Sequence, residues 1–258
     1  MRAERAMIET SEDAVLGGRL RLRQPLRGHR VGHDAILLAA ATGGRASEQA
    51  VDLGAGVGAA GLALAARVGG LKVTLVEIDD GLCALAADNA GLNRLDDRVR
   101  ALLADAENPQ ALIAAGLSPA SVDRVLMNPP FNDAKRQNVS PDPRRRLAYV
   151  GEPGLLARWV ATAAQLLKPQ GVLTMIWRAD GLDEVLDALS GEFGSIVVLP
   201  VLPRPEAAAI RVLVRAVRGA HGARRDYPAL LLNDATGRPT AAAEAVLRAG
   251  DTLSITGK

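Results

Sequence analysis

The sequence predicts an α/β protein built on a mainly parallel, doubly wound sheet of seven strands. From residue 49 to residue 200, short apolar segments of strand length alternate with segments of helix length, which is typical of βαβ units. The hydrophobic fraction is 48%, mostly Ala, Leu and Val, while aromatic residues make up only 2%. Such a composition favours small-residue helices packed closely on a sheet that is buried on both faces. A chain of 258 residues is long enough for one such core.

The elements follow one another in a regular order. Residues 1–17 have no clear periodicity, so we expect no regular structure there, whereas residues 18–24 alternate Arg and Leu as in a half-buried strand. A helix is expected over 32–42, with Asp34 near its start. Further strands are expected at 50–53, 71–79, 99–105, 122–128, 171–177, 195–200 and 209–217, and further helices at 58–68, 81–93, 109–116, 154–168 and 181–192.

The last two strands are joined by a short segment that contains prolines, Pro200 to Ala209. This is too short for a crossover helix, so the two strands should form an antiparallel hairpin at the edge of the sheet. We therefore expect a short N-terminal extension over 1–45, a main domain over 46–218 and a C-terminal tail over 219–258 that packs on the same domain.

The net charge of +2 hides an uneven distribution of charged residues. Residues 51–130 hold 10 acidic and 6 basic residues, whereas residues 19–30 hold 5 basic and no acidic ones. Residues 131–150 and 200–225 are also basic, with 5 against 2 and 6 against 1. Such a pattern fits a small-molecule site beside a surface for a polyanion, or simply a solvated surface with an arginine-rich composition.

A glycine-rich segment, "VDLGAGVGAAG", connects the strand at 50–53 to its helix. Gly54, Gly56 and Gly58 lack Cβ atoms, so a ligand can approach the backbone amides at the helix N-terminus, although a plain strand–helix turn would also use glycines. Glu77 lies at the end of the next strand, where a carboxylate can bind both hydroxyls of a ribose. Asp105, at the end of the following strand, could accept a hydrogen bond from an adenine amino group while the Ala106 amide contacts the ring.

These features would also suit a nicotinamide-dependent dehydrogenase. Asp52 argues against that reading, because the corresponding position is normally apolar in dinucleotide-binding folds, while a carboxylate there suits a cationic ligand. The segment "NPPF", Asn128-Pro129-Pro130-Phe131, also argues against it. A turn after a buried strand would explain the two prolines but neither the amide nor the aromatic ring.

In the order of these motifs the chain resembles the class I S-adenosylmethionine-dependent methyltransferases, which implies a Rossmann-like sheet and S-adenosylmethionine as cofactor. In that superfamily, Asn-Pro-Pro-aromatic marks methylation of an amine conjugated to a planar system. The resemblance implies that Asn128 and the Pro129 carbonyl accept the two N–H groups of the amine, that Pro130 holds the turn rigid, and that Phe131 stacks on the substrate ring. No metal is required, because the leaving group is a cationic sulfur.

The N-terminal region resembles, more narrowly, bacterial tRNA adenine-N6 methyltransferases that act on valine tRNA. The segment from Gly32 to Leu38 matches a Gly-x-Asp-x-x-Leu-Leu element that closes over the cofactor in that family, although His33 replaces a small residue or Thr. The resemblance completes the expected cofactor contacts: Gly32, Asp34, Asp52, Gly54, Gly56, Gly58, Glu77, Ile78, Asp105, Ala106 and Asn128.

RNA is accordingly the expected partner, most of all a tRNA anticodon loop, because an unstacked base can enter a pocket at low cost. The long segment 132–150 is either functional or a solvated loop. Basic residues that could neutralise phosphates are Arg19, Arg21, Arg23, Lys135, Arg136, Arg144, Arg145, Arg146 and Arg204, with Arg211 and Arg215 extending the same rim.

Several alternatives stay open. The same tetrapeptide occurs in guanine-N2 rRNA methyltransferases, and glutamine-N5 protein methyltransferases usually have Tyr at position 131. A protein that binds the cofactor and acts as an RNA chaperone without catalysis is the non-enzyme alternative. A single cysteine, Cys83, agrees with a cytoplasmic location, we expect neither a signal peptide nor a membrane segment, and the histidines lack the spacing of a metal site.

Overall fold

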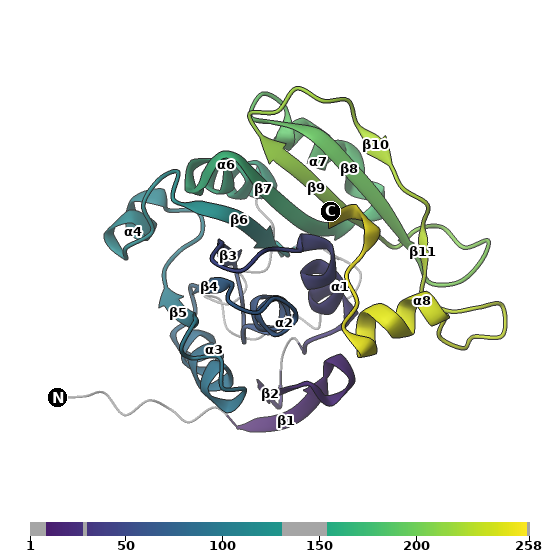
Figure 1. Ribbon diagram of the computed structural model, residues 1–258, viewed down its shortest axis with the longest axis horizontal. Coiled ribbons are helices and arrows are strands. Elements are labelled where there is room, and N and C mark those ends of the chain that lie inside the picture. The colour runs from purple at the N-terminus through teal and green to yellow at the C-terminus, as the bar shows by residue number, and fades with distance from the viewer. Residues whose placement is uncertain (1–8, 28–29, 131–153, 257–258) are drawn as a thin grey trace.

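A computed structural model describes residues 9–27, 30–130 and 154–256 of the chain (Figure 1). Its centre is a nine-stranded sheet in the order β10-β8-β9-β7-β6-β3-β4-β5, with β11 also paired to β8. The seven longer strands are the ones that the sequence predicts, and the fold class is confirmed. They are β3 (Gln49–Leu53), β4 (Lys72–Glu77), β5 (Val99–Leu103), β6 (Val122–Met127), β7 (Leu167–Arg178), β8 (Phe193–Leu202) and β9 (Arg211–Arg218).

Helices alternate with these strands along the chain. They are α1 (His33–Thr42), α2 (Ala59–Arg67), α3 (Asp80–Leu92), α4 (Pro109–Ala114), α6 (Leu155–Leu166), η2 (Ala179–Gly181) and α7 (Leu182–Leu189). Among these helices, two begin at a side-chain cap: Asp79 accepts from the amides of Gly81 and Leu82, and Asn108 accepts from the amide of Ala111.

The predicted antiparallel pairing of the last two long strands is confirmed, but their position at the edge is not. β9 lies between β7 and β8 and is antiparallel to both, so β8 is the outer strand of the pair. The free side of β8 is then covered by two short parallel strands, β10 (Arg225–Asp226) and β11 (Leu230–Leu231). The short connection fixes the antiparallel direction, but it does not fix the side of β8 on which β9 is inserted.

Two layers of buried side chains enclose the sheet. One contains residues of α1, α2 and α3, and the other contains residues of α4, α6 and α7. Both faces are therefore covered, as a parallel sheet requires. In the described part of the chain, no helix is both long enough and apolar enough to cross a bilayer.

The expectation of no regular structure before residue 18 is wrong for part of that segment. Thr10–Val15 form β1, which pairs antiparallel with β2 (Leu20–Pro25) across the 3-10 turn η1 (Leu16–Gly18). β1 escapes detection because its sequence, TSEDAV, is polar on both sides. The predicted alternation in β2 is present, since Leu20 and Leu22 are buried while Arg21 and Arg23 are exposed.

The last part of the chain crosses the layer of α1 and ends beside that helix (Figure 1). It contains α8 (Ala241–Glu244), η3 (Ala245–Ala249) and η4 (Ser254–Thr256). Arg67 ties it to α2, donating to the carbonyl oxygens of Asp251 and Val246 at 2.9 Å each. This segment therefore packs on the helix layer rather than projecting from it.

Candidate cofactor and substrate site

The predicted site residues meet at the carboxyl ends of the central parallel strands. Leu53 of β3 is paired with Val76 of β4 and with Met127 of β6. Gly54, Glu77 and Asn128 each follow one of these residues, so they leave the sheet side by side. This is the edge at which open α/β sheets bind ligands.

The glycine loop has the backbone conformation that requires glycine. Gly54 and Gly56 have φ values of 68° and 57°, in the left-handed region. A Cβ on Gly54 would lie 2.4 Å from Cη2 of Trp159 in α6, so this glycine allows the indole ring to pack against the loop. A Cβ on Gly56 would have no atom of the described residues within 4 Å, so as far as those residues go the space beside Gly56 is open to a ligand.

Glu77 anchors this loop through its carboxylate. Oε2 accepts from the Gly56 amide at 2.8 Å, and Oε1 accepts from the amides of Ile78 at 3.0 Å and Asp79 at 2.9 Å. A carboxylate offers about four lone-pair positions, so one remains for a ligand hydroxyl. If Glu77 binds both ribose hydroxyls, as the sequence suggests, one of these amides must give up its bond.

Two apolar side chains beside this carboxylate are exposed. Ile78 and Leu103, which follow and end neighbouring strands, are 61% and 50% exposed. Asp105 lies two residues after Leu103, and its Oδ1 accepts from the Glu107 amide at 2.8 Å, while Ala106 is buried. An apolar surface next to hydrogen-bonding groups suits the flat ring of a nucleoside.

Asp52 lies beneath the loop rather than at its surface. It is 2% exposed, and its Oδ2 accepts from the Gly61 amide of α2 at 2.8 Å. Burial raises the pKa of Asp52 to about 7 against the lowering effect of the Gly61 hydrogen bond, and the charge of Glu77 raises it further. Asp52 therefore holds α2 against β3, and a cationic ligand above it would favour its ionised form.

Asn128 carries a buried polar atom without a partner. Its Oδ1 accepts no hydrogen bond from the residues that the structure describes. Buried acceptors are nearly always satisfied, so this oxygen is expected to receive a donor from outside the described residues. Pro129 is buried beside it, whereas Phe131 lies outside the described residues.

The element around Gly32 and Asp34 lies at the same edge but farther along the sheet. Gly32 precedes α1 in extended conformation, and Asp34 Oδ2 accepts from Arg211 Nε at 2.8 Å. Arg211 begins β9 opposite Arg178, the last residue of β7. Asp34 thus pairs with an arginine that the sequence had placed on an RNA-binding rim.

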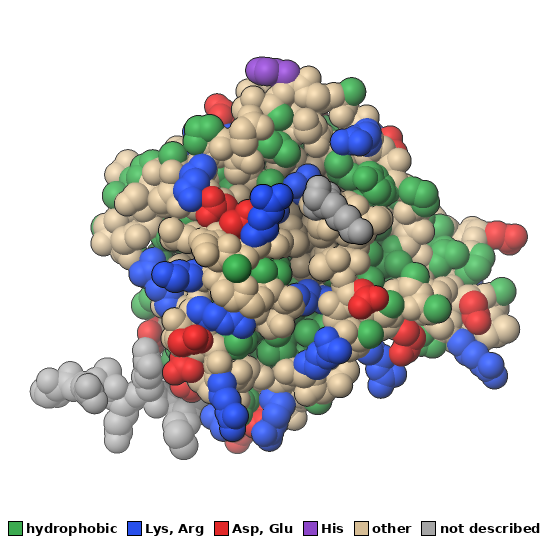
Figure 2. All heavy atoms as spheres, viewed as in Figure 1, with side chains coloured by type: hydrophobic (Ala, Val, Ile, Leu, Met, Phe, Trp, Pro, Cys, Tyr) green, Lys and Arg blue, Asp and Glu red, His purple; other side chains and the backbone are tan. Residues whose placement is uncertain are grey.

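The other basic residues are not gathered in one patch. Arg21 and Arg23 both pair with Glu12 of β1, and 3.6 Å separates Arg23 Nε from Glu12 Oε2. Arg19 lies beside Gly250. Figure 2 shows basic and acidic side chains interspersed over this hairpin. Arg204 is exposed in the connection from β8 to β9, at the carboxyl edge of the sheet. The remaining predicted residues, Lys135, Arg136, Arg144, Arg145 and Arg146, lie outside the described residues.

Two asparagines, Asn89 in α3 and Asn93 directly after it, hold the N-terminal hairpin, and Asn89 also joins it to the glycine loop; the sequence analysis missed them. Asn89 accepts from the Arg23 amide at 2.8 Å and donates to the carbonyls of Arg23 and Val57, both at 3.0 Å. Asn93, one helical turn later, makes the same pair of bonds to the backbone of Arg21. Two carboxamides four residues apart in an otherwise alanine- and leucine-rich helix were the available signal.

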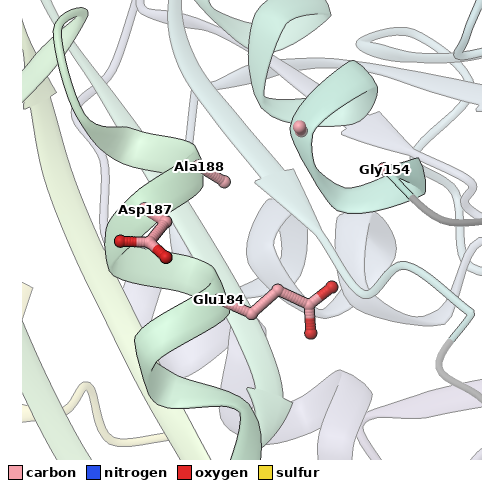
Figure 3. A pocket seen from close by; sticks show the side chains of 5 residues that line it. Gly154, Glu184, Asp187 and Ala188 are labelled. Carbon is pink, nitrogen blue, oxygen red and sulfur yellow. The ribbon is translucent and has the colours of Figure 1, made fainter.

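A separate hollow of about 470 Å³ lies between α6 and α7 (Figure 3). It is lined by Glu184, Asp187 and Ala188 of α7, by Ala157 of α6 and by Gly154, which precedes α6. None of the predicted site residues that the structure describes lines this hollow. Within the described ranges, no group of His, Cys, Asp and Glu side chains could hold a metal ion.

The residues at the carboxyl edge fit a nucleoside cofactor such as S-adenosylmethionine. The open space beside Gly56, the remaining acceptor position of Glu77 and the exposed Ile78 provide room, a hydrogen-bond acceptor and an apolar surface. The oxygen of Asn128 that lacks a partner among the described residues lies at the same edge.

Comparison with known proteins places the chain in a family. Residues 30–200 match the family model described as "Methyltransferase small domain". A tRNA1(Val) (adenine(37)-N6)-methyltransferase from Porphyromonas gingivalis is 31% identical over 160 residues, which cover 60% of this chain and 61% of that protein. A release factor glutamine methyltransferase from Chlorobaculum tepidum is also 31% identical, over 59% of this chain and 53% of that one. The matched region thus spans little more than half the length of these relatives.

A solved structure resembles almost the whole fold. A protein from Agrobacterium tumefaciens, described as a predicted O-methyltransferase, superposes with a TM-score of 0.72 and 28% identity over 85% of this chain and 97% of that one. The family model covers well over half of the chain. The chain therefore belongs to the methyltransferase small domain family.

Proposed function

We propose that this protein transfers a methyl group from S-adenosylmethionine to the exocyclic N6 amine of an adenine in structured RNA, most of all in a tRNA anticodon loop. The observation that carries the proposal is the buried, unpartnered Oδ1 of Asn128 beside the glycine loop. A hydrogen-bond acceptor fixed at this position suits a neutral amine that must be oriented, and it does not suit hydride transfer.

Methyl transfer requires the protein mainly to orient the acceptor amine. When bound, the cofactor supplies an electrophilic methyl group on a sulfonium, so no metal or strong base is needed. An adenine amine is a weak nucleophile because its lone pair is delocalised into the ring. Asn128 Oδ1 and the Pro129 carbonyl would each accept one N–H, which turns the lone pair toward the methyl group. With the lone pair so oriented, the amine would take the methyl group as the sulfonium leaves as a neutral thioether, and would then release one proton to water.

Binding of the cofactor would be divided among three strand ends. Glu77 would accept a ribose hydroxyl, Ile78 would cover one face of the adenine, and Asp105 would accept from its amino group. Asp52 would lose its proton when the positively charged cofactor binds above it.

The names of the similar proteins support adenine in tRNA as the acceptor. Several curated relatives carry the name of tRNA1(Val) adenine-N6 methyltransferase, with identities of 28 to 31%. The basic segment from Lys135 to Arg146 could neutralise phosphates beside the base. If so, RNA affinity should fall steeply with salt, and replacing Arg144, Arg145 and Arg146 together should flatten that slope without changing cofactor affinity.

A second candidate is methylation of a glutamine side chain in a protein. It is supported by the similarity to a release factor glutamine methyltransferase at the same 31% identity. Its acceptor is also a conjugated amide nitrogen, so Asn128 would serve equally well.

One experiment separates these candidates. The protein is incubated with tritiated S-adenosylmethionine and, in parallel, with bulk tRNA, bulk rRNA or total protein, and the labelled products are hydrolysed and identified. We expect N6-methyladenosine from tRNA. Labelled N2-methylguanosine from rRNA, or labelled N5-methylglutamine from protein, would show that the substrate is guanine or glutamine instead of adenine. If the cofactor binds but none of the three incubations yields a labelled product, the protein does not methylate these acceptors.

A further inference from the structure

A second pocket, of about 310 Å³, lies on the helix face of the sheet that α1 covers, away from Asn128. Its lining residues come from the end of α1, from the strands beneath it and from the last residues of the chain. They are Gly43, Gly44, Arg45, Val68, Arg124, Arg215, Thr252 and Thr256. Arg124 is paired with Ala50 near the start of β3, whereas Asn128 follows the end of β6. The pocket therefore opens toward the opposite edge of the sheet from the methyl-transfer site.

Three arginines and no acidic residue line this pocket in the part of the chain that the structure describes. Arg124 is neutralised, because its Nε and Nη2 donate to the Glu48 carboxylate at 2.7 and 3.2 Å, and its Nη1 donates to the Thr42 carbonyl at 3.3 Å. Arg45 is exposed at the rim. The positive charge of Arg124 is thus largely balanced by Glu48. The charge of Arg215 has no such partner among the described residues.

Arg215 is a partly buried cation that lacks a counter-ion among the described residues. It lies on β9 opposite Thr174 of β7, and its Nε is buried without a hydrogen-bond partner in that part of the chain. Burial lowers its pKa, and the positive charge of Arg124 lowers it further. An unpaired buried charge is costly, so a fold that keeps one in a pocket is expected to gain by binding an anion there.

We infer that this pocket binds a phosphate group. The guanidinium plane of Arg215 can donate two parallel N–H bonds to phosphate oxygens, and the threonine hydroxyls and glycine amides at the rim add further donors. The volume is at the small end of the range for ligand pockets, which suits a phosphate with a small group attached. The phosphate could belong to a free phosphorylated metabolite or to an RNA backbone, and the same chemistry recognises both.

Thermal unfolding in inorganic phosphate tests this inference without any methyl-transfer assay, so its outcome is independent of the proposed function. Phosphate stabilises proteins in general by exclusion from their surface, so chloride at equal ionic strength and matched variants are needed. The test variants are Arg215→Met and Arg45→Met, and the control is Arg238→Met, which changes an exposed arginine in a distant turn.

In chloride, Arg215→Met should unfold at the same temperature as the wild type or above it, since it removes a buried unpaired charge. In phosphate, the wild type and Arg238→Met should gain several degrees more than Arg215→Met does, with Arg45→Met in between. Calorimetric titration with phosphate should give one site in the wild type and a Kd at least tenfold higher in Arg215→Met. Equal responses of all four proteins, or no saturable heat, would overturn the inference.

A measurement of RNA binding then distinguishes an RNA backbone phosphate from a free phosphorylated molecule. A short RNA hairpin is titrated into the wild type, Arg215→Met and Arg238→Met at one salt concentration. If Arg215→Met weakens RNA binding several-fold more than Arg238→Met does, the pocket receives a backbone phosphate. If the two variants bind RNA alike while only Arg215→Met loses phosphate binding, the ligand is a free phosphorylated molecule.

Discussion

Replacing Gly54 and Gly56 by alanine, one at a time, should separate the stability of the glycine loop from its ligand binding. At Gly54 a Cβ costs about 1–2 kcal/mol for the left-handed backbone. The same Cβ would lie 2.4 Å from Cη2 and 2.9 Å from Cζ3 of Trp159, and relieving such a contact in a packed core costs about 1–3 kcal/mol. Gly54→Ala should therefore lower the free energy of unfolding by about 2–5 kcal/mol.

Gly56→Ala is the matched control, because its φ of 57° is similar and no atom of the described part of the chain would lie within 4 Å of its Cβ. Its unfolding free energy should fall by only about 1–2 kcal/mol. Its new methyl group, however, would occupy the space expected for the cofactor, so the Kd for S-adenosylhomocysteine should rise at least tenfold.

Urea unfolding followed by tryptophan fluorescence measures the stability difference, and calorimetry measures the binding difference. Equal losses of stability in the two variants would show that Trp159 does not constrain the loop. Normal S-adenosylhomocysteine affinity in Gly56→Ala would mean that the open space beside Gly56 is not the cofactor site.

Three further predictions concern single side chains. Asn128→Ala should lower single-turnover methyl transfer about 10²–10³-fold while changing RNA affinity little; near-normal rates would reduce this amide to a turn residue. The raised pKa of Asp52 means that its protonated form is favoured by folding, so the unfolding free energy should fall by about 1.4 kcal/mol per pH unit between about pH 4 and the native pKa of about 7. Denaturant titrations at several pH values measure this dependence of the unfolding free energy on pH, and Asp52→Asn should remove it. If the variant kept the same slope of unfolding free energy against pH, the raised pKa would not belong to Asp52. Asn89→Ala should lower the free energy of unfolding, measured in urea, by about 2–4 kcal/mol, because it leaves buried backbone groups unpaired. Asn93 is more exposed, so Asn93→Ala should lower it less; equal losses would show that the buried bonds of Asn89 contribute nothing extra.

The position of the site could be predicted from the sequence for a simple reason. The carboxyl ends of parallel strands share one edge, so polar residues that follow successive apolar segments must meet there. Gly54, Glu77 and Asn128 do so because β3, β4 and β6 are neighbours in register. That adjacency itself came from the resemblance to a methyltransferase fold, since periodicity alone does not order the strands.

Contacts between distant segments could not be predicted in this way. β9 is buried on both faces, so its sequence does not reveal that Arg215 points into a pocket beneath α1. The pairing of Asp34 with Arg211 depends on where β9 is inserted, which the short connection leaves undecided. The three amides on Glu77 follow from the local turn geometry, and a sequence motif reports only that a carboxylate is present.

The two short strands beside β8 have a consequence for how the protein behaves in concentrated solution. β10 and β11 together pair with only four residues of β8, Val197, Val198, Val201 and Leu202, yet they occupy the last open edge on that side of the sheet. An uncovered strand rich in valine is a template on which another chain can add a strand and begin to aggregate. The segment after residue 219 thus protects this edge against the addition of another strand. Shortening the chain before Arg225 should expose β8 and promote aggregation, and because it also removes Val246, Leu253 and Ile255 from the core that α1 and α2 share, it should lower the free energy of unfolding as well.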